Sequence, residues 1–261
     1  MLNMVRAQLY RIAKSRFSVF YAIVLFVIAA ATPFALWLHN VWPAFAETGF
    51  VEVPADPLPS LQLYGVSFLG GSFAAMGVGV AVSELVAGDF KSGYVKNLVQ
   101  ARGGRASYAV AVAVCALAIS AATTLFGMIV VEGALRLQGY APVAPSAAEA
   151  LQWFAQATLC CAAYATVTAL IAIATRSEAV AVLAAIFLGG GAVESVCKLV
   201  LTNIPGIPAA LRDCLDGYLA TDLATLAQGV VCDPMAYVQA GATILVVGAA
   251  CVLVMRRRSL G

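Results

Sequence analysis

Six long apolar runs constrain the fold of this chain more than any other feature of its sequence. A helix that crosses the hydrocarbon core of a bilayer needs about 20 apolar residues, and each run is long enough. Only 11% of all residues are charged, too few for an ordinary soluble domain. We predict a single all-α integral membrane domain over residues 1–261. Its six transmembrane helices are expected at residues 17–38, 61–83, 106–131, 151–175, 179–201 and 236–255.

The distribution of basic residues predicts the orientation of these spans. Six crossings put both termini on one side, and that side carries twelve of the fifteen Lys and Arg residues. Cytoplasmic segments of membrane proteins are enriched in Lys and Arg. We therefore expect a multi-pass protein of the cell membrane with both termini in the cytoplasm. The net charge of +2 gives no reason to expect a nucleic-acid partner.

The first residues, "MVRAQLYRIAKSRF", predict an amphipathic helix ahead of the first span. Val5, Leu9 and Ile12 fall on one helical face, and Gln8 and Arg11 fall elsewhere. This pattern is typical of a helix that lies in the inner membrane interface with its cations at the lipid headgroups. The helix could contact a cytoplasmic partner or serve only to orient the first span.

A second polar segment, "SELVAGDFKSGYVKNLVQARGGRASY", joins the second and third spans. Phe90, Tyr94 and Leu98 recur every four residues, which predicts a short cytoplasmic helix with one apolar stripe. Such a helix suits the transmission of force to or from a partner. The spacing alone fits equally a surface loop whose basic residues meet anionic lipid.

These two segments resemble those of type-2 ABC-exporter permeases, in particular the small six-span lantibiotic- and bacitracin-immunity permeases. The matching positions of the second segment are Asp89, Gly93, Lys96, Asn97, Leu98 and Arg105. A Lys that often follows the Arg in such permeases is Ala111 here.

The resemblance implies that residues 89–99, with Phe90 and Tyr94 among them, form a coupling helix seated on a separate ATP-binding subunit. The chain has no GxxxxGK[ST] motif. ATP and Mg²⁺ would therefore bind to that partner, and this chain would hold no cofactor itself. The resemblance also implies a second permease copy, as a homodimer or heterodimer. The exported substrate would be amphipathic: an antimicrobial peptide, a hydrophobic drug or a lipid.

Small and charged residues within the spans are further candidates for packing or functional roles. Gly71, Ala75 and Gly79 repeat every four residues, which lets a second helix approach closely, either within the chain or across a dimer. Glu194 and Lys198 share a face of the fifth span in its outer third. They could form a structural ion pair or line a substrate path. Gly189–Gly191 in the same span could be a hinge or a site of close packing.

The segment before the last span, residues 202–234, is expected outside the cell. Leu211, Leu215, Leu219 and Leu223 repeat every four residues and predict a short extracellular helix. Cys214 and Cys232 lie in the same segment, where a disulfide would be stable, so a bridge between them is possible.

Enzymatic activity is not expected from this sequence. It lacks GxSxG and HExxH motifs, and no Cys or His residues have metal-binding spacing. The alternatives to an exporter permease are an ATP-independent secondary carrier and a membrane scaffold or sensor. A carrier should have charges near the middle of the membrane.

Overall fold

The computed structural model describes residues 2–42, 59–95, 104–203 and 218–257, and these ranges are helical with no β-strand. The elements are α1 (Leu2–Lys14), α2 (Arg16–Val41), α4 (Ser60–Tyr64), π-helix η1 (Gly65–Leu69), 3₁₀ helix η2 (Gly70–Ser72), α5 (Phe73–Lys91), α7 (Gly104–Leu137), α8 (Ala147–Thr175), α9 (Glu178–Gly189), α10 (Ala192–Asn203), α12 (Leu219–Ala227) and α13 (Met235–Arg257). The predicted all-α fold class is confirmed.

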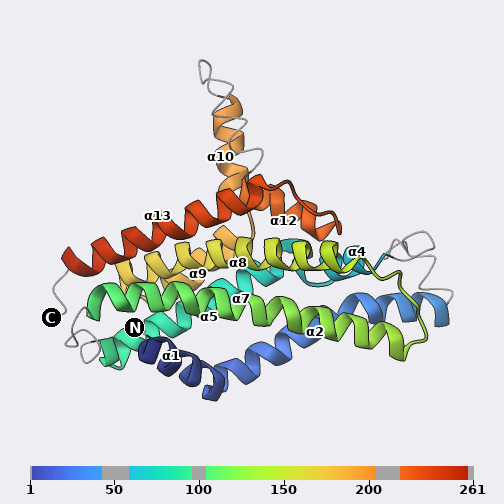
Figure 1. Ribbon diagram of the computed structural model, residues 1–261, viewed down its shortest axis with the longest axis horizontal. Coiled ribbons are helices and arrows are strands. Elements are labelled where there is room, and N and C mark those ends of the chain that lie inside the picture. Colours follow the sequence, from blue (N-terminus) through green and yellow to red (C-terminus); the bar gives the residue numbers. More distant parts are fainter. Residues whose placement is uncertain (1, 43–58, 96–103, 204–217, 258–261) are drawn as a thin grey trace.

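The long helices form one elongated bundle around α8 (Figure 1). In the most apolar stretch of α8, 72% of residues are buried, against 22% in α2 and 17% in α13. The buried face of α8 is rich in Ala and Cys, whose small side chains let α5, α7, α9 and α13 pack closely around it. The start of α1 and the end of α13 lie at the same end of the bundle.

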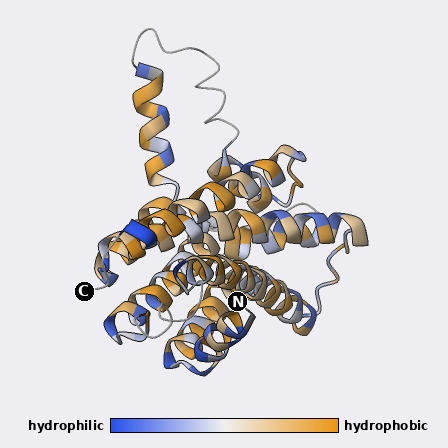
Figure 2. Ribbon diagram, turned by 60° about the vertical axis from the view of Figure 1, so that its left-hand side comes forward, coloured by the Kyte–Doolittle hydropathy of each residue, from blue (hydrophilic) through white to orange (hydrophobic). Residues whose placement is uncertain are grey.

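Apolar residues cover the outside of the bundle as well as its core (Figure 2). On α2, for example, Phe20, Ile23 and Val27 are all more than half exposed. Among the described residues, five helices are long and apolar enough to cross a membrane, and α9 with α10 would add a sixth if that bent pair is one span. These features indicate a multi-pass membrane protein.

The fifth predicted span is not a straight helix. It breaks at Gly189–Gly191, and α10 leaves α9 at an angle of 60° and stands away from the bundle (Figure 1). Gly191 has a φ of +71°, a left-handed conformation that favours glycine. A Cβ atom on Gly189 would lie 2.8 Å from the backbone N of Met76. The three glycines therefore provide both the bend and the close packing that the sequence left open.

The small residues of α5 pack inside the chain, against α9. Gly79 faces Ala185, where a Cβ on the glycine would lie 3.0 Å from the alanine Cβ. One turn away, the Ser83 hydroxyl donates to the Ala181 carbonyl at 3.3 Å, and Ala75 faces Gly189. Gly71 is not part of this contact, contrary to the sequence-based expectation. It has a φ of +64° in η2, before α5 begins.

Helix α12 covers the irregular start of the second span. Leu219 and Leu223 of the predicted leucine repeat are buried in α12, while Leu211 and Leu215 lie outside the described residues. A Cβ on Gly65 of η1 would lie 2.4 Å from the Ala227 carbonyl oxygen, so the two backbones are in close contact.

Candidate functional site

Asp89, a buried charged residue of the predicted coupling segment, lies near the end of α5. The helix continues to Lys91, past the predicted end of the second span at residue 83. Asp89 therefore lies in the last turns of this helix, and its side chain is 0% exposed. We expected Asp89 on a separate cytoplasmic helix that touches a partner. The structure instead places its side chain inside the bundle, and contact of this segment with another chain stays a prediction.

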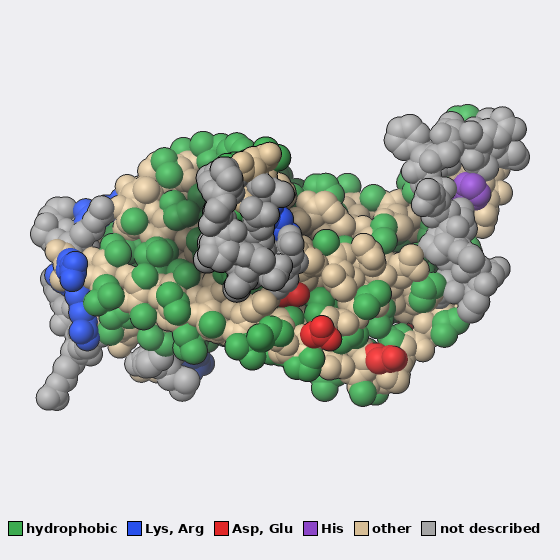
Figure 3. Space-filling model, turned by 90° about the horizontal axis from the view of Figure 1, so that it is seen from above, with side chains coloured by type: hydrophobic (Ala, Val, Ile, Leu, Met, Phe, Trp, Pro, Cys, Tyr) green, Lys and Arg blue, Asp and Glu red, His purple; other side chains and the backbone are tan. Residues whose placement is uncertain are grey.

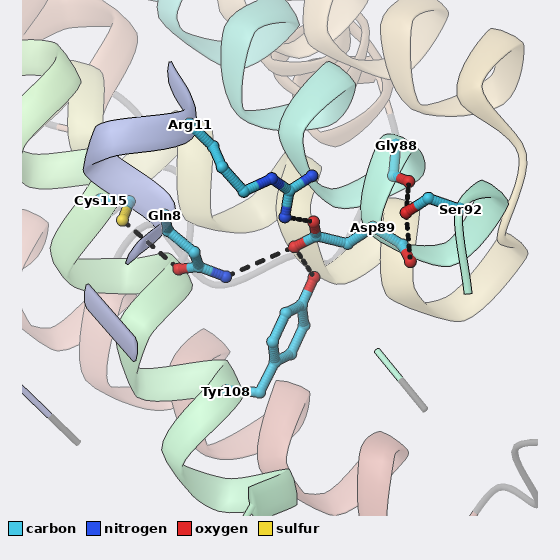
Figure 4. Close-up of polar contacts among 7 residues, drawn as sticks. All are labelled: Gln8, Arg11, Gly88, Asp89, Ser92, Tyr108 and Cys115. Atoms are coloured by element: carbon cyan, nitrogen blue, oxygen red, sulfur yellow. Dashed lines mark hydrogen bonds and ion pairs between the residues drawn. The ribbon is translucent and has the colours of Figure 1, made fainter. Parts of the chain in front are cut away.

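Three donors surround the Asp89 carboxyl group, as Figure 4 shows. Arg11 of α1 forms an ion pair with it, Tyr108 of α7 donates a hydrogen bond at 3.1 Å, and the Gln8 amide of α1 donates at 3.4 Å. The Cys115 thiol of α7 donates in turn to the Gln8 amide oxygen at 3.4 Å. A buried carboxylate is tolerated only with such partners. Asp89 thus joins α1, α5 and α7 at one point.

Gly93 ends the helix immediately after this cluster. Its φ is +70°, and its N–H donates to the Phe90 carbonyl at 3.2 Å. Ser92 adds a hydroxyl hydrogen bond to the Gly88 carbonyl at 2.7 Å. Left-handed glycine is the usual way to stop a helix and turn the chain. The backbone therefore changes direction directly before Tyr94.

The aromatic residues of the segment pack against cations from two other helices. The Arg11 guanidinium lies 4.4 Å from the centre of the Tyr94 ring. The Phe90 ring lies 5.7 Å from the Arg176 guanidinium and packs edge-on against Tyr108, with 6.5 Å between ring centres. Such cation–π contacts contribute about 0.5–2 kcal/mol each, depending on burial. We call Gln8, Arg11, Asp89, Phe90, Tyr94 and Tyr108 the Asp89 junction.

The remaining residues of the predicted coupling set lie elsewhere. Arg105 donates to the Arg256 carbonyl at the end of α13, at 3.0 Å, and takes no part in the Asp89 junction. Lys96, Asn97 and Leu98 lie outside the described residues. Gln8, Tyr108 and Cys115 had no predicted role. Arg11 was expected at the lipid headgroups, but it pairs with Asp89 inside the protein.

A second polar cluster lies where α10 leaves the bundle. Glu194 and Lys198 form an ion pair of 3.4 Å. The Glu194 carboxylate also accepts from the Ala220 N–H at 3.1 Å and from the Tyr164 hydroxyl at 3.4 Å. Lys198 donates to Thr221 at 3.0 Å. Tyr164 lies near the middle of α8. The Glu194 carboxylate therefore lies beside the middle of α8, and Lys198 lies beside α12.

Cys232 is buried beside α12 as a free thiol, and it donates to the Asp222 carbonyl at 3.4 Å. Burial raises the pKa of Cys232 to about 12, which disfavours the reactive thiolate form near neutral pH. Cys214 lies outside the described residues, and a Cys214–Cys232 bridge stays a prediction. Within the described ranges, no group of three or more His, Cys, Asp or Glu side chains is placed to hold a metal ion.

Comparisons with protein-family models and with curated protein sequences give no match to this chain.

Proposed function

We propose that the chain is the permease subunit of a type-2 ABC exporter. In this proposal a separate ATP-binding subunit docks at the end of the bundle where α1 begins and α13 ends. A second permease copy completes the transporter, and the substrate is an amphipathic peptide, drug or lipid. Helix α1 lies along the inner membrane interface, the bent α9–α10 pair takes the place of the fifth span, and α12 lies on the extracellular side.

The Asp89 junction is the observation that supports this function best. A partner that pushes on the segment after Gly93 first meets Tyr94, whose ring is held by Arg11. Arg11 is in turn paired with Asp89 near the end of α5. A displacement of Tyr94 therefore reaches α1, α5 and α7 together. Force from nucleotide binding would in this way move several helices as one unit.

The charged end of the bundle suits a cytoplasmic partner. Most Lys and Arg side chains visible on the face shown in Figure 3 gather at one end. Since Lys and Arg mark the cytoplasmic side, the Asp89 junction would face the cytosol. This is the side where an ATP-binding subunit has access to nucleotide.

The first test is co-purification of the tagged chain from its native membrane in mild detergent. We expect an ATP-binding subunit in stoichiometric amount. Tyr94→Asp should release that subunit, because the new carboxylate lies next to Arg11 and competes with Asp89 for it. Tyr94→Phe is the matched control, since it keeps the ring over Arg11 and should retain the subunit. Membrane insertion should be the same for both variants.

Two results would contradict the exporter proposal. One is a preparation that contains no ATP-binding protein even after chemical crosslinking. The other is a bound ATPase that both Tyr94 variants retain equally, which would leave the junction without a role in coupling.

A specific observation favours an ATP-independent carrier as the second candidate. A carrier needs charged residues near the middle of the membrane, and Glu194, paired with Lys198, contacts Tyr164 near the middle of α8. For a carrier, Glu194→Gln should abolish substrate accumulation in vesicles that contain no ATP. For an exporter, transport in the same vesicles should require added ATP and the partner subunit.

A further inference from the structure

A pocket of about 360 Å³ opens between α1, the start of α2 and α5. Its polar side is formed by Arg11 and Lys14 of α1, and its apolar side includes Leu85 and Ile119. Lys14 is exposed, and the Arg11 side chain remains 38% exposed although it pairs with Asp89. The pocket therefore combines cations with an apolar wall.

A second pocket of about 230 Å³ lies next to the first, between α2 and α5. Both are lined by Phe17 and Tyr21, so they share one wall. The second pocket is almost entirely apolar, and its far end is lined by Ile28 of α2 and Phe73 of α5. We call the two neighbouring pockets together the α2–α5 groove, and its cations lie at one end only.

Rigid contacts fix the wall that the two pockets share. Tyr21 lies against Gly77, where a Cβ atom would come within 2.9 Å of the ring. The Tyr21 hydroxyl is also hydrogen-bonded to Thr123 of α7, at 2.9 Å. At the cationic end, Ser15 caps α2 by accepting from the Ser18 N–H at 3.1 Å. These contacts fix the corner between α1 and α2 and therefore the position of Lys14.

The charge of the groove selects its occupant. Glu84 is a carboxylate among the lining residues, and its carboxyl group interacts with Glu178 and Lys91. The α1 side of the pocket is cationic. An amphipathic ligand with a negative group at the α1 side and a hydrocarbon chain along α2 and α5 matches this distribution.

We propose that the α2–α5 groove binds one anionic phospholipid of the surrounding leaflet. Its phosphate lies at Lys14 and Arg11, and one acyl chain follows the apolar part of the groove between α2 and α5. This inference does not depend on the exporter proposal. It applies equally if the chain is a carrier.

Native mass spectrometry of the full chain in detergent tests this site, with palmitoyl-oleoyl phosphatidylglycerol and the phosphatidylcholine that has the same chains as probes. We expect one tightly bound phosphatidylglycerol and weaker binding of phosphatidylcholine. Lys14→Ala should reduce the affinity for phosphatidylglycerol about fivefold, the effect of about 1 kcal/mol for one cation near an anionic lipid. Arg6→Ala is the matched control, because Arg6 is also exposed on α1 but does not line the pocket.

Two substitutions on α2 test the acyl-chain part of the groove. Val24 lines the apolar pocket, whereas Val27 is 61% exposed and lines neither pocket. Val24→Trp should cause loss of both lipids, and Val27→Trp should change neither. sn-Glycerol 1-phosphate, which has the phosphate without the chains, should not compete.

Several outcomes would overturn the site. Equal binding of both lipids to the wild-type chain, or equal effects of Lys14→Ala and Arg6→Ala, would indicate that Lys14 recognises no headgroup. Equal effects of Val24→Trp and Val27→Trp would indicate only the unspecific lipid shell. Competition by sn-glycerol 1-phosphate would point to a soluble phosphate compound as the ligand instead.

Discussion

Asp89 shows how one buried charge can organise three helices. The Asp89 carboxyl group is fully buried, and the donors that satisfy it come from α1 and α7. Burial of an ion pair contributes little net stability, because desolvation of both charges opposes their attraction. Removal of one partner is nevertheless costly, since the other charge is left buried. Asp89 and Arg11 therefore specify how α1 docks more than they stabilise the fold.

A double-mutant comparison at this pair is our residue-scale prediction. Arg11→Ala should lower the free energy of unfolding by about 2 kcal/mol, less than a fully buried pair would lose, because Arg11 is partly exposed. Asp89→Leu combined with Arg11→Met should restore most of that loss, since no charge is then left buried. Thermal unfolding of the purified protein in detergent measures both. Equal losses for the single and the double variant would contradict a buried ion pair.

At the scale of the element, the contact between α5 and α9 depends on residues without bulk. The two helices are antiparallel, and Ala75, Gly79 and Ser83 lie against Gly189, Ala185 and Ala181 in that order. In a membrane the hydrophobic effect does not drive helices together, so they associate through close packing of their backbones. A glycine at such a contact is required by the space available, not by its flexibility.

Gly189→Ala tests this packing. The added methyl group would meet the Met76 backbone at 2.8 Å, and we expect a loss of about 1–3 kcal/mol from overpacking. Gly248→Ala in α13 is the matched control, because a Cβ there meets no atom of the described residues within 4 Å. Its stability should be unchanged or slightly higher, as alanine favours a helix. Similar thermal shifts for the two variants would show that α9 does not pack on α5 this closely.

At the scale of the whole molecule, the start of α1 and the end of α13 lie at the same end of the bundle, and basic residues gather at this end (Figure 1, Figure 3). Arg11 and Lys14 in α1, Lys91 in α5, Arg176 after α8 and Arg257 in α13 all lie at or near the ends of helices. A bundle with its basic ends together has one cytoplasmic side. In this arrangement the chain between α9 and α13 must reach the opposite side of the membrane, whether or not α10 itself crosses the membrane.

Epitope tags can test that topology. Tags inserted after Thr48 and after Ala209 should be reached by antibody on intact cells. Tags at both termini and after Ala101 should be reached only after permeabilisation, because basic flanks remain in the cytoplasm. Western blots for full-length protein control for expression of each tagged chain. A C-terminal tag that is accessible on intact cells would contradict the predicted orientation.

The sequence by itself determined that this protein is built from long apolar helices. Apolar runs of about 20 residues can be stable only as membrane helices, because backbone groups must be satisfied inside the segment. The ends of α8 and α13 follow the predicted limits within a few residues. The spacing of Glu194 and Lys198 also predicted their ion pair, since residues four apart share a helical face.

The tertiary structure alone decided which faces of those elements meet. Periodicity assigned Gln8 and Arg11 to the polar surface, but a buried carboxylate from a distant helix turned both inward. After the bend at Gly191, Glu194 lies beside the middle of α8. Its carboxylate accepts hydrogen bonds from α12 and α8. Local sequence reports which face of a helix is apolar. It does not predict which polar group of another helix will lie against that face, because that contact depends on the packing of the whole bundle.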